Sequence, residues 1–256
     1  MNDTYILAFC LSFLAGAATV IGAAVAFVIK RENLSLLAIG LGFSAGVMLY
    51  VSFMEILPHA KEALTQLYGQ SGNWLATAVF FVGIFLAGGI DRCLPSHHMQ
   101  IHTLDPSDKL KRLGLFTALA LAIHNFPEGL ATFLATIDNT TLGISVAVAV
   151  ALHNIPEGIA VALPIFHATE NRRQAFWYSA FSGLAEPLGA CVGFFFITWI
   201  LHQAALGMMF ALVAGIMVYI SLDELLPTAH DYGNGHLVIM GVIGGMGLMA
   251  LCLLIF

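Results

Sequence analysis

The chain has 256 residues, of which 59% are apolar and only 9% are charged, whereas an average soluble domain carries roughly a quarter charged residues. So little charge excludes a water-soluble globule, and so much apolar content excludes a disordered chain. The formal net charge of −6, with nine Lys and Arg against fifteen Asp and Glu, argues against a nucleic-acid-binding protein. We therefore expect an integral membrane protein, with the lipid bilayer as its surroundings.

Eight apolar stretches along the chain are each long enough to cross a bilayer, which takes about 20 mostly apolar residues. Polar or basic segments separate them, and the longest of these, at about 93–112, is expected to be a cytoplasmic loop. The predicted fold is an all-α integral membrane protein with one transmembrane domain over residues 1–256. The eight predicted helices cover 4–29, 36–57, 73–92, 113–137, 141–165, 175–200, 205–227 and 237–256.

The basic residues indicate the orientation of the chain in the membrane. If the N-terminus is outside, eight of the nine Lys and Arg fall in cytoplasmic connections, and only Lys61 falls outside. The positive-inside rule favours this arrangement, because cytoplasmic connections carry the excess of Lys and Arg. We therefore expect both termini on the outer side of the membrane. The cytoplasmic group consists of Lys30, Arg31, Arg92, Lys109, Lys111, Arg112, Arg172 and Arg173.

A segment of the second predicted helix recurs in the seventh. Residues 45–58 and 214–227 are identical at eight of fourteen positions, which include an intramembrane Glu and a Pro. The two helices are an odd number of spans apart, so the copies would run in opposite directions. This predicts an inverted repeat of helices one to three and six to eight, placed around central helices four and five in a 3+2+3 arrangement.

The two central helices carry the same motif, H-N-x-P-E-G. The His and Glu of each copy are four residues apart and share one helix face, about 6 Å apart along the axis. Two such faces brought together would form a site for a divalent metal ion, and the two Asn side chains could offer oxygen atoms to a second ion. The motif residues are His124, Asn125 and Glu128 in one copy, and His153, Asn154 and Glu157 in the other.

Further acidic residues lie at membrane depth. Glu186, in the sixth helix, is flanked by small residues and Pro187, and we interpret it as an additional metal ligand. One buried acid in a membrane helix is as easily structural as functional. Seven acids with no Lys or Arg clearly inside a span favour a path for cations. They are Glu55, Asp91, Glu128, Glu157, Glu186, Asp223 and Glu224.

The doubled motif resembles that of the ZIP (Zrt/Irt-like) family of divalent metal transporters, and the short chain with Glu186 in an A-E-P-L-G setting resembles its compact bacterial type. The resemblance implies an eight-helix bundle that takes up Zn²⁺, and in some members Fe²⁺, Mn²⁺ or Cd²⁺. It also implies a centre for two metal ions. One ion would use His124, Glu128, His153 and Glu157, and the other Asn125, Glu128, Asn154, Glu157 and Glu186.

Other residues are weaker candidates for the ion pathway. Met48 is a candidate thioether ligand, although a Met in a membrane helix more often only packs. Glu55, Asp223 and Glu224 lie near helix ends, where they are equally well interpreted as entrance and exit relays or as interfacial polar groups. The loop histidines His97, His98 and His102 would receive or sense ions, or would simply be solvated.

Two other functions compete with metal transport. An intramembrane metalloenzyme would also use His and carboxylates, but neither the Glu-x-x-His nor the His-Glu-x-x-His pattern occurs. A proton-coupled carrier of another solute would use acids as a relay, but two His-x-x-x-Glu sets suit a metal better. We expect a transporter with no catalytic cofactor. Gly241, Gly244 and Gly245 would permit a close helix contact, including one in a homodimer.

Overall fold

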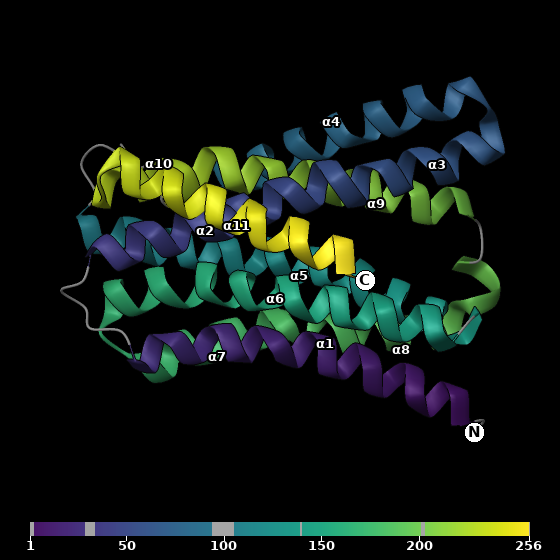
Figure 1. The fold of residues 1–256 in the computed structure, drawn as a ribbon, viewed down its shortest axis with the longest axis horizontal. Helices are drawn as coiled ribbons and strands as arrows, with labels where there is room; N and C mark the ends of the chain where they lie inside the picture. The colour runs from purple at the N-terminus through teal and green to yellow at the C-terminus, as the bar shows by residue number, and fades with distance from the viewer. Residues whose placement is uncertain (1–2, 29–33, 94–104, 139, 201–202, 256) are drawn as a thin grey trace.

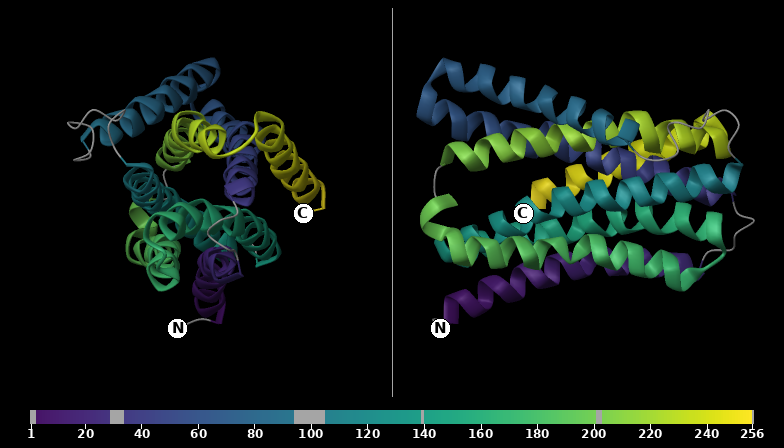
Figure 2. Two further views of the ribbon diagram at one scale, coloured as in Figure 1. Left: turned by 90° about the vertical axis from the view of Figure 1, so that its left-hand side faces the viewer. Right: turned by 180° about the vertical axis from the view of Figure 1, so that it is seen from behind.

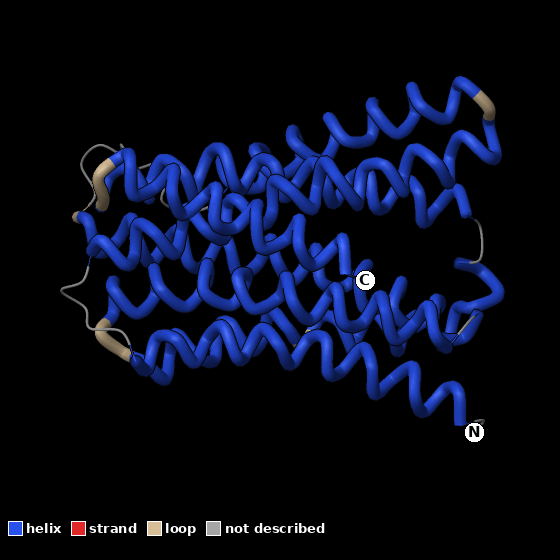
Figure 3. The backbone as a smooth tube through the Cα atoms, in the orientation of Figure 1, coloured by secondary structure: helices blue, strands red, loops and turns tan. Residues whose placement is uncertain are grey.

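The computed structural model describes residues 3–28, 34–93, 105–138, 140–200 and 203–255. These residues are almost entirely helical and include no strand (Figure 3). The helices are α1 (Asp3–Val28), α2 (Leu34–Val51), η1 (Ser52–Ile56), α3 (Leu57–Tyr68), α4 (Gln70–Cys93), α5 (Pro106–Asp138), α6 (Thr140–Thr169), α7 (Arg172–Gly183), α8 (Ala185–Ile200), α9 (Gln203–Tyr219), η4 (Ile220–Leu225), α10 (Leu226–Tyr232) and α11 (Gly235–Ile255).

The helices form an elongated bundle with their axes roughly aligned (Figures 1 and 2). Three sets of helices follow one another with little or no break: α2 with η1 and α3, α7 with α8, and α9 with η4 and α10. Successive runs alternate in direction, so α11 runs toward the end of the bundle at which α1 begins (Figure 1). The central pair, α5 and α6, packs side by side between α1 and α8.

Six segments of the described chain are long and apolar enough to cross a membrane, so the protein is a multi-pass membrane protein. Large apolar side chains such as Phe85 and Phe195 face outward on the helix bundle and are about three-quarters exposed, as lipid-facing residues are. The apolar stretches expected at 113–137 and 175–200 are helical, within α5 and α7–α8, but are not among the six. The six segments are Asp3–Ala24, Leu34–Tyr68, Gln70–Arg92, Val146–Thr169, Gly207–Tyr232 and Gly235–Leu254.

The recurring sequence segment has the same local structure in both copies. Each contains a π-helical turn, η1 in the first and η4 in the second, followed by a proline at the start of the next helix. A proline in a helix clashes with the carbonyl four residues earlier, and a wider π turn relieves the clash. At the start of each turn, a serine hydroxyl donates to the carbonyl four residues back, from Ser52 to Met48 (2.7 Å) and from Ser221 to Met217 (2.8 Å).

Helix boundaries differ from the sequence expectation at two places. The loop expected at 93–112 is shorter, because α5 begins at Pro106, where proline suits a first helical turn. The carbonyl of Asp105 accepts from the amides of Asp108 (3.0 Å) and Lys109 (3.1 Å). The polar segment after the second predicted span is helix α3, which buries Ala60 and Leu64 and turns only at Gly69.

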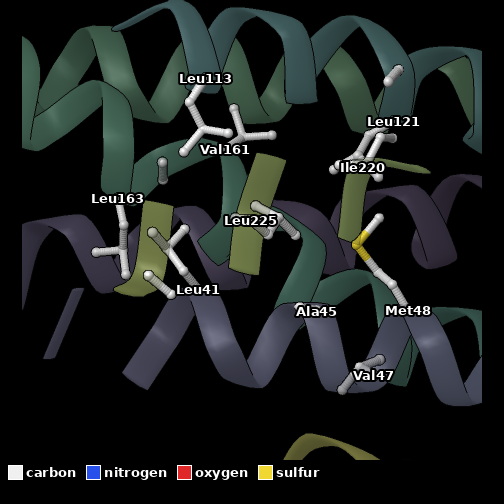
Figure 4. Packing of buried hydrophobic residues seen from close by; sticks show 14 of the residues in the cluster. Leu41, Ala45, Val47, Met48, Leu113, Leu121, Val161, Leu163, Ile220 and Leu225 are labelled. Atoms are coloured by element: carbon white, nitrogen blue, oxygen red, sulfur yellow. The ribbon is translucent and has the colours of Figure 1, made fainter. Parts of the chain in front are cut away.

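A hydrophobic core joins the repeated segments to the central helices (Figure 4). Leu41 and Met48 of α2 and Leu225 of η4 pack in one cluster with residues of α5 and α6, such as Leu121 and Val161. This cluster holds the two central helices in register with α2 and η4, and so with each other.

The small residues of α11 serve a contact within the chain. Gly241 and Gly245 lie against the backbone of α2 at Ile39 and Phe43. These glycines therefore explain how α11 packs on α2. They do not support the homodimer, which stays a prediction.

Candidate metal centre

The facing helices α5 and α6 bring together side chains from both copies of the motif. His124 Nε2 lies 3.1 Å from an oxygen of Glu128, one turn further along α5. The same nitrogen lies 3.2 Å from an oxygen of Glu157 on α6. One imidazole thus meets a carboxylate from each central helix, as the i, i+4 spacing predicts for two facing copies.

The two Asn residues of the motifs are oriented by the helices around them. Asn154 Nδ2 donates to the carbonyl of Ala15 on α1 (2.9 Å) and also to Glu186 on α8. Asn125 Nδ2 donates to the carbonyl of Ser182 on α7 (3.2 Å). Because the amide nitrogens are used for these bonds, the amide oxygens of both Asn side chains remain for another partner.

The site is sealed from the outside of the bundle. Glu128 is 7% exposed, and the other described motif residues and Glu186 are 0% exposed. Within the described part of the chain, no Lys or Arg forms an ion pair with Glu157 or Glu186. Several buried oxygen atoms at the site accept no hydrogen bond from the described residues, among them Asn125 Oδ1, Asn154 Oδ1, Glu157 Oε2 and Glu186 Oε2. Buried carboxylates without a paired cation are costly, so this donor set suits a bound divalent cation.

The glycine that ends each motif allows a neighbouring helix to come close. A Cβ atom at Gly129 would lie 2.0 Å from the carbonyl oxygen of Glu186, and one at Gly158 would lie 2.0 Å from that of Thr19. No side chain fits at either position, so α8 and α1 approach the central helices closely next to the two motif glutamates. The first contact sets Glu186 beside Glu128.

A second acidic cluster includes two residues of η4. Its residues are distant in sequence from the two motifs. Oxygen atoms of Asp91, Asp223 and Glu224 lie within 4.8 Å of one another. Arg112 of α5 forms an ion pair with Asp91, and its Nη1 lies 3.6 Å from Glu224. Arg112 was expected in the loop at 93–112, and its pairing with Asp91 was not predicted. No local pattern signals it, because it depends on α4, α5 and η4 meeting.

The remaining candidates lie elsewhere. Met48 is buried in the hydrophobic core, with its sulfur directed toward Leu121 and Ile220 (Figure 4). Glu55 is half-buried in η1, and its carbonyl is 2.9 Å from Nδ1 of the exposed His59. The loop histidines His97, His98 and His102, and the side chain of His153, lie outside the described residues.

Comparison with known proteins shows one consistent likeness. A family model described as ZIP Zinc transporter matches residues 93–253. A protein named Zinc transporter ZupT from Chlorobaculum parvum is 52% identical over 267 residues, covering 100% of both chains. Proteins of the same name from Chlorobium phaeovibrioides and Streptococcus mutans are 55% and 51% identical, and each alignment covers 100% of this chain and at least 99% of the relative.

Proposed function

The chain belongs to the ZIP family of zinc transporters, and we propose that it carries zinc into the cytoplasm through the site between α5, α6 and α8. It is a transporter rather than an enzyme. The observation that carries the proposed route is the meeting of His124, Glu128 and Glu157, next to the bonded pair of Asn154 and Glu186. Nitrogen and carboxylate ligands are those that zinc takes in proteins.

We infer that the site holds two ions side by side. The described donors fall into an imidazole group around His124 and an all-oxygen group that includes Glu186, with Glu128 and Glu157 available to both. A hard oxygen site and a mixed nitrogen–oxygen site differ in the ions they prefer. Such a pair is consistent with passage of Fe²⁺, Mn²⁺ or Cd²⁺ as well as Zn²⁺. His153 is proposed as the second imidazole ligand on the strength of its motif alone.

We also propose eight membrane crossings in the 3+2+3 arrangement, with helices α5 and α7–α8 added to the six apolar segments. At 1.5 Å per residue, the 33 residues of α5 extend about 50 Å, more than the hydrocarbon core requires. Its lower hydropathy follows from the polar motif, which neighbouring helices bury. Matching π turns in α2–η1 and α9–η4, which run in opposite directions, support the inverted repeat.

This arrangement puts both termini outside the bacterial inner membrane. An ion then enters near Glu55, sheds water as it reaches the buried site, and leaves past Asp223 and Glu224 toward the loop histidines. Transport requires that the site weaken for release. A shift of α8 away from α5 would withdraw Glu186 from the all-oxygen group, and protonation of a shared glutamate would withdraw a ligand from both ions.

Zinc flux through proteoliposomes tests the function and the site together. Purified protein is reconstituted with a zinc-sensitive dye inside the vesicles, and zinc is added outside. We expect rapid entry with the wild type and a loss of at least tenfold with Glu157→Gln, which keeps the shape of the side chain and removes its charge. The exposed Glu62 of α3 supplies the matched control, Glu62→Gln, which keeps the wild-type rate.

Gel filtration and bound-metal analysis of both variants separate misfolding from loss of the site. Wild-type entry in a well-folded Glu157→Gln protein would refute the proposed site. If vesicles that contain well-folded wild-type protein take up no zinc, the proposed function itself is refuted. Competition by Fe²⁺, Mn²⁺ and Cd²⁺ in the same assay tests the range of ions.

A further inference from the structure

A groove runs along the outward face of α7, away from the metal centre. Its volume is about 520 Å³, and it is lined by Asn171, Arg173, Gln174, Trp177, Tyr178 and Phe181. This volume lies within the roughly 300–1,000 Å³ that is usual for small-ligand sites. From Gln174 onward, the lining residues recur every three or four positions, so they form one stripe along the helix. The opposite face of α7 is buried, at Ala175 and Ser179 among others.

The groove changes from polar to apolar along its length. Its polar end is the start of α7, where Asn171 caps the helix by accepting from the Gln174 amide (3.0 Å). Its apolar end is aromatic. The stacked rings of Trp177 and Phe181 have centres 5.6 Å apart, and the two residues are 46% and 61% exposed to solvent. From Arg173 to Phe181 the helix rises about 12 Å, enough to pass from the headgroup layer into the hydrocarbon of a bilayer.

The charge at the polar end is suited to an anion. Arg173 lines the groove, is exposed, and forms no ion pair with any residue that the structure describes. The neighbouring Arg172 lies over the Phe166 ring, 5.2 Å from its centre. The described segment 166–178 contains these two guanidinium groups and one carboxylate, that of Glu170, so its charge is positive. Tyr and Trp just below are the residues enriched where a membrane meets water.

We propose that this groove binds one anionic phospholipid of the cytoplasmic leaflet. Its phosphate lies at Arg173 and the polar rim, and an acyl chain lies along Trp177, Tyr178 and Phe181. A lipid explains why the basic end and the aromatic stripe are continuous, which neither a soluble anion nor a purely apolar partner requires. The assignment to the cytoplasmic leaflet depends on the orientation proposed above, but the binding itself does not.

Quenching of Trp177 fluorescence by brominated lipids tests this directly. With Trp74 and Trp199 replaced by Phe, the protein is reconstituted into phosphatidylcholine vesicles that contain either brominated phosphatidylglycerol or brominated phosphatidylcholine. One basic residue near a membrane surface contributes about 1 kcal/mol toward anionic lipid, so we expect about a fivefold preference for phosphatidylglycerol. Arg173→Gln removes this preference. Arg92→Gln, at the exposed end of α4, keeps it.

Four results would overturn the proposal. Equal quenching by both lipids would show that the groove does not select an anionic headgroup. An equal loss in both arginine variants would assign the preference to general surface charge. A response of Trp177 emission to millimolar inorganic phosphate in pure phosphatidylcholine, with no preference among lipids, would identify a free anion as the ligand. Shielding of Trp177 from every brominated lipid in a dimeric protein would assign the groove to a second copy of the chain.

Discussion

The contact between α5 and α8 at Gly129 offers a sharp test of the metal centre, because the replacement leaves every proposed ligand chemically unchanged. In Gly129→Ala, the new Cβ would lie 2.0 Å from the carbonyl oxygen of Glu186, whereas real Cβ contacts are essentially never shorter than 3.0 Å. The obstacle is backbone rather than a flexible side chain. Helices α5 and α8 must therefore separate by about 1 Å, and Glu186 moves with α8.

A displacement of this size is large for a metal site. Ligand distances are held to within about 0.2 Å, so an ion that bridges the two helices loses its contact with Glu186. Changes that disturb ligand orientation usually cost about 10–100-fold in metal affinity, and we expect a loss in this range. Overpacking of this kind also costs about 1–3 kcal/mol of stability, which lowers the unfolding temperature without preventing folding.

Zinc affinity measured by titration calorimetry, alongside flux in proteoliposomes, checks the prediction. Gly247→Ala is the matched control, because a Cβ atom at Gly247 of α11 has no neighbour within 4 Å. This control should keep wild-type affinity and flux. If Gly129→Ala is folded and binds and transports zinc like the wild type, then the close approach of α8 does not set the geometry of the site and the reasoning is wrong.

Two further predictions concern the polar contacts around the bundle interior. Asn154→Leu removes both the hydrogen bond to Glu186 and the amide oxygen proposed as a metal ligand, and leaves a shape of similar size. We therefore expect at least about a tenfold weaker zinc affinity; unchanged affinity in calorimetry would contradict this. Arg112→Gln removes the guanidinium that pairs with the buried Asp91. Breaking a buried ion pair typically costs about 3–5 kcal/mol, and thermal unfolding should report a lower transition temperature. Adding Asp91→Asn should restore much of that loss, and failure to do so would show that the ion pair is not the cause.

The repeated segment was recognisable in the sequence because each copy keeps the residues that set its local structure. The proline that ends each copy forces a wider turn before it, and the serine in that turn donates a hydrogen bond back along the helix. Similar residues therefore produce similar turns. The extent of helix α3 was not recognisable in this way. Its polar composition suggested a connection, but Ala60 and Leu64 are buried against the bundle and keep the segment helical.

The candidate site, too, could be predicted only in part from the sequence. The i, i+4 spacing of His and Glu is a property of one helix, and it could be read from the sequence for each motif separately. The bond between Asn154 and Glu186 joins residues 32 positions apart, and no spacing rule predicts which face of α8 meets α6. Similarly, Arg112 could be counted as a loop residue until α5 was seen to begin at Pro106.

The sequence by itself determined the membrane environment, the order of the helices and the residue types able to hold a metal, because hydropathy, charge and helical spacing are local properties of the chain. The tertiary structure alone decided which of those residues meet. Helix contacts depend on where small residues let backbones approach, as at Gly129 and Gly158, and on what packs around them. These contacts join Glu186 to the central motifs and Arg112 to the acidic cluster, and they leave the aromatic stripe of α7 facing outward.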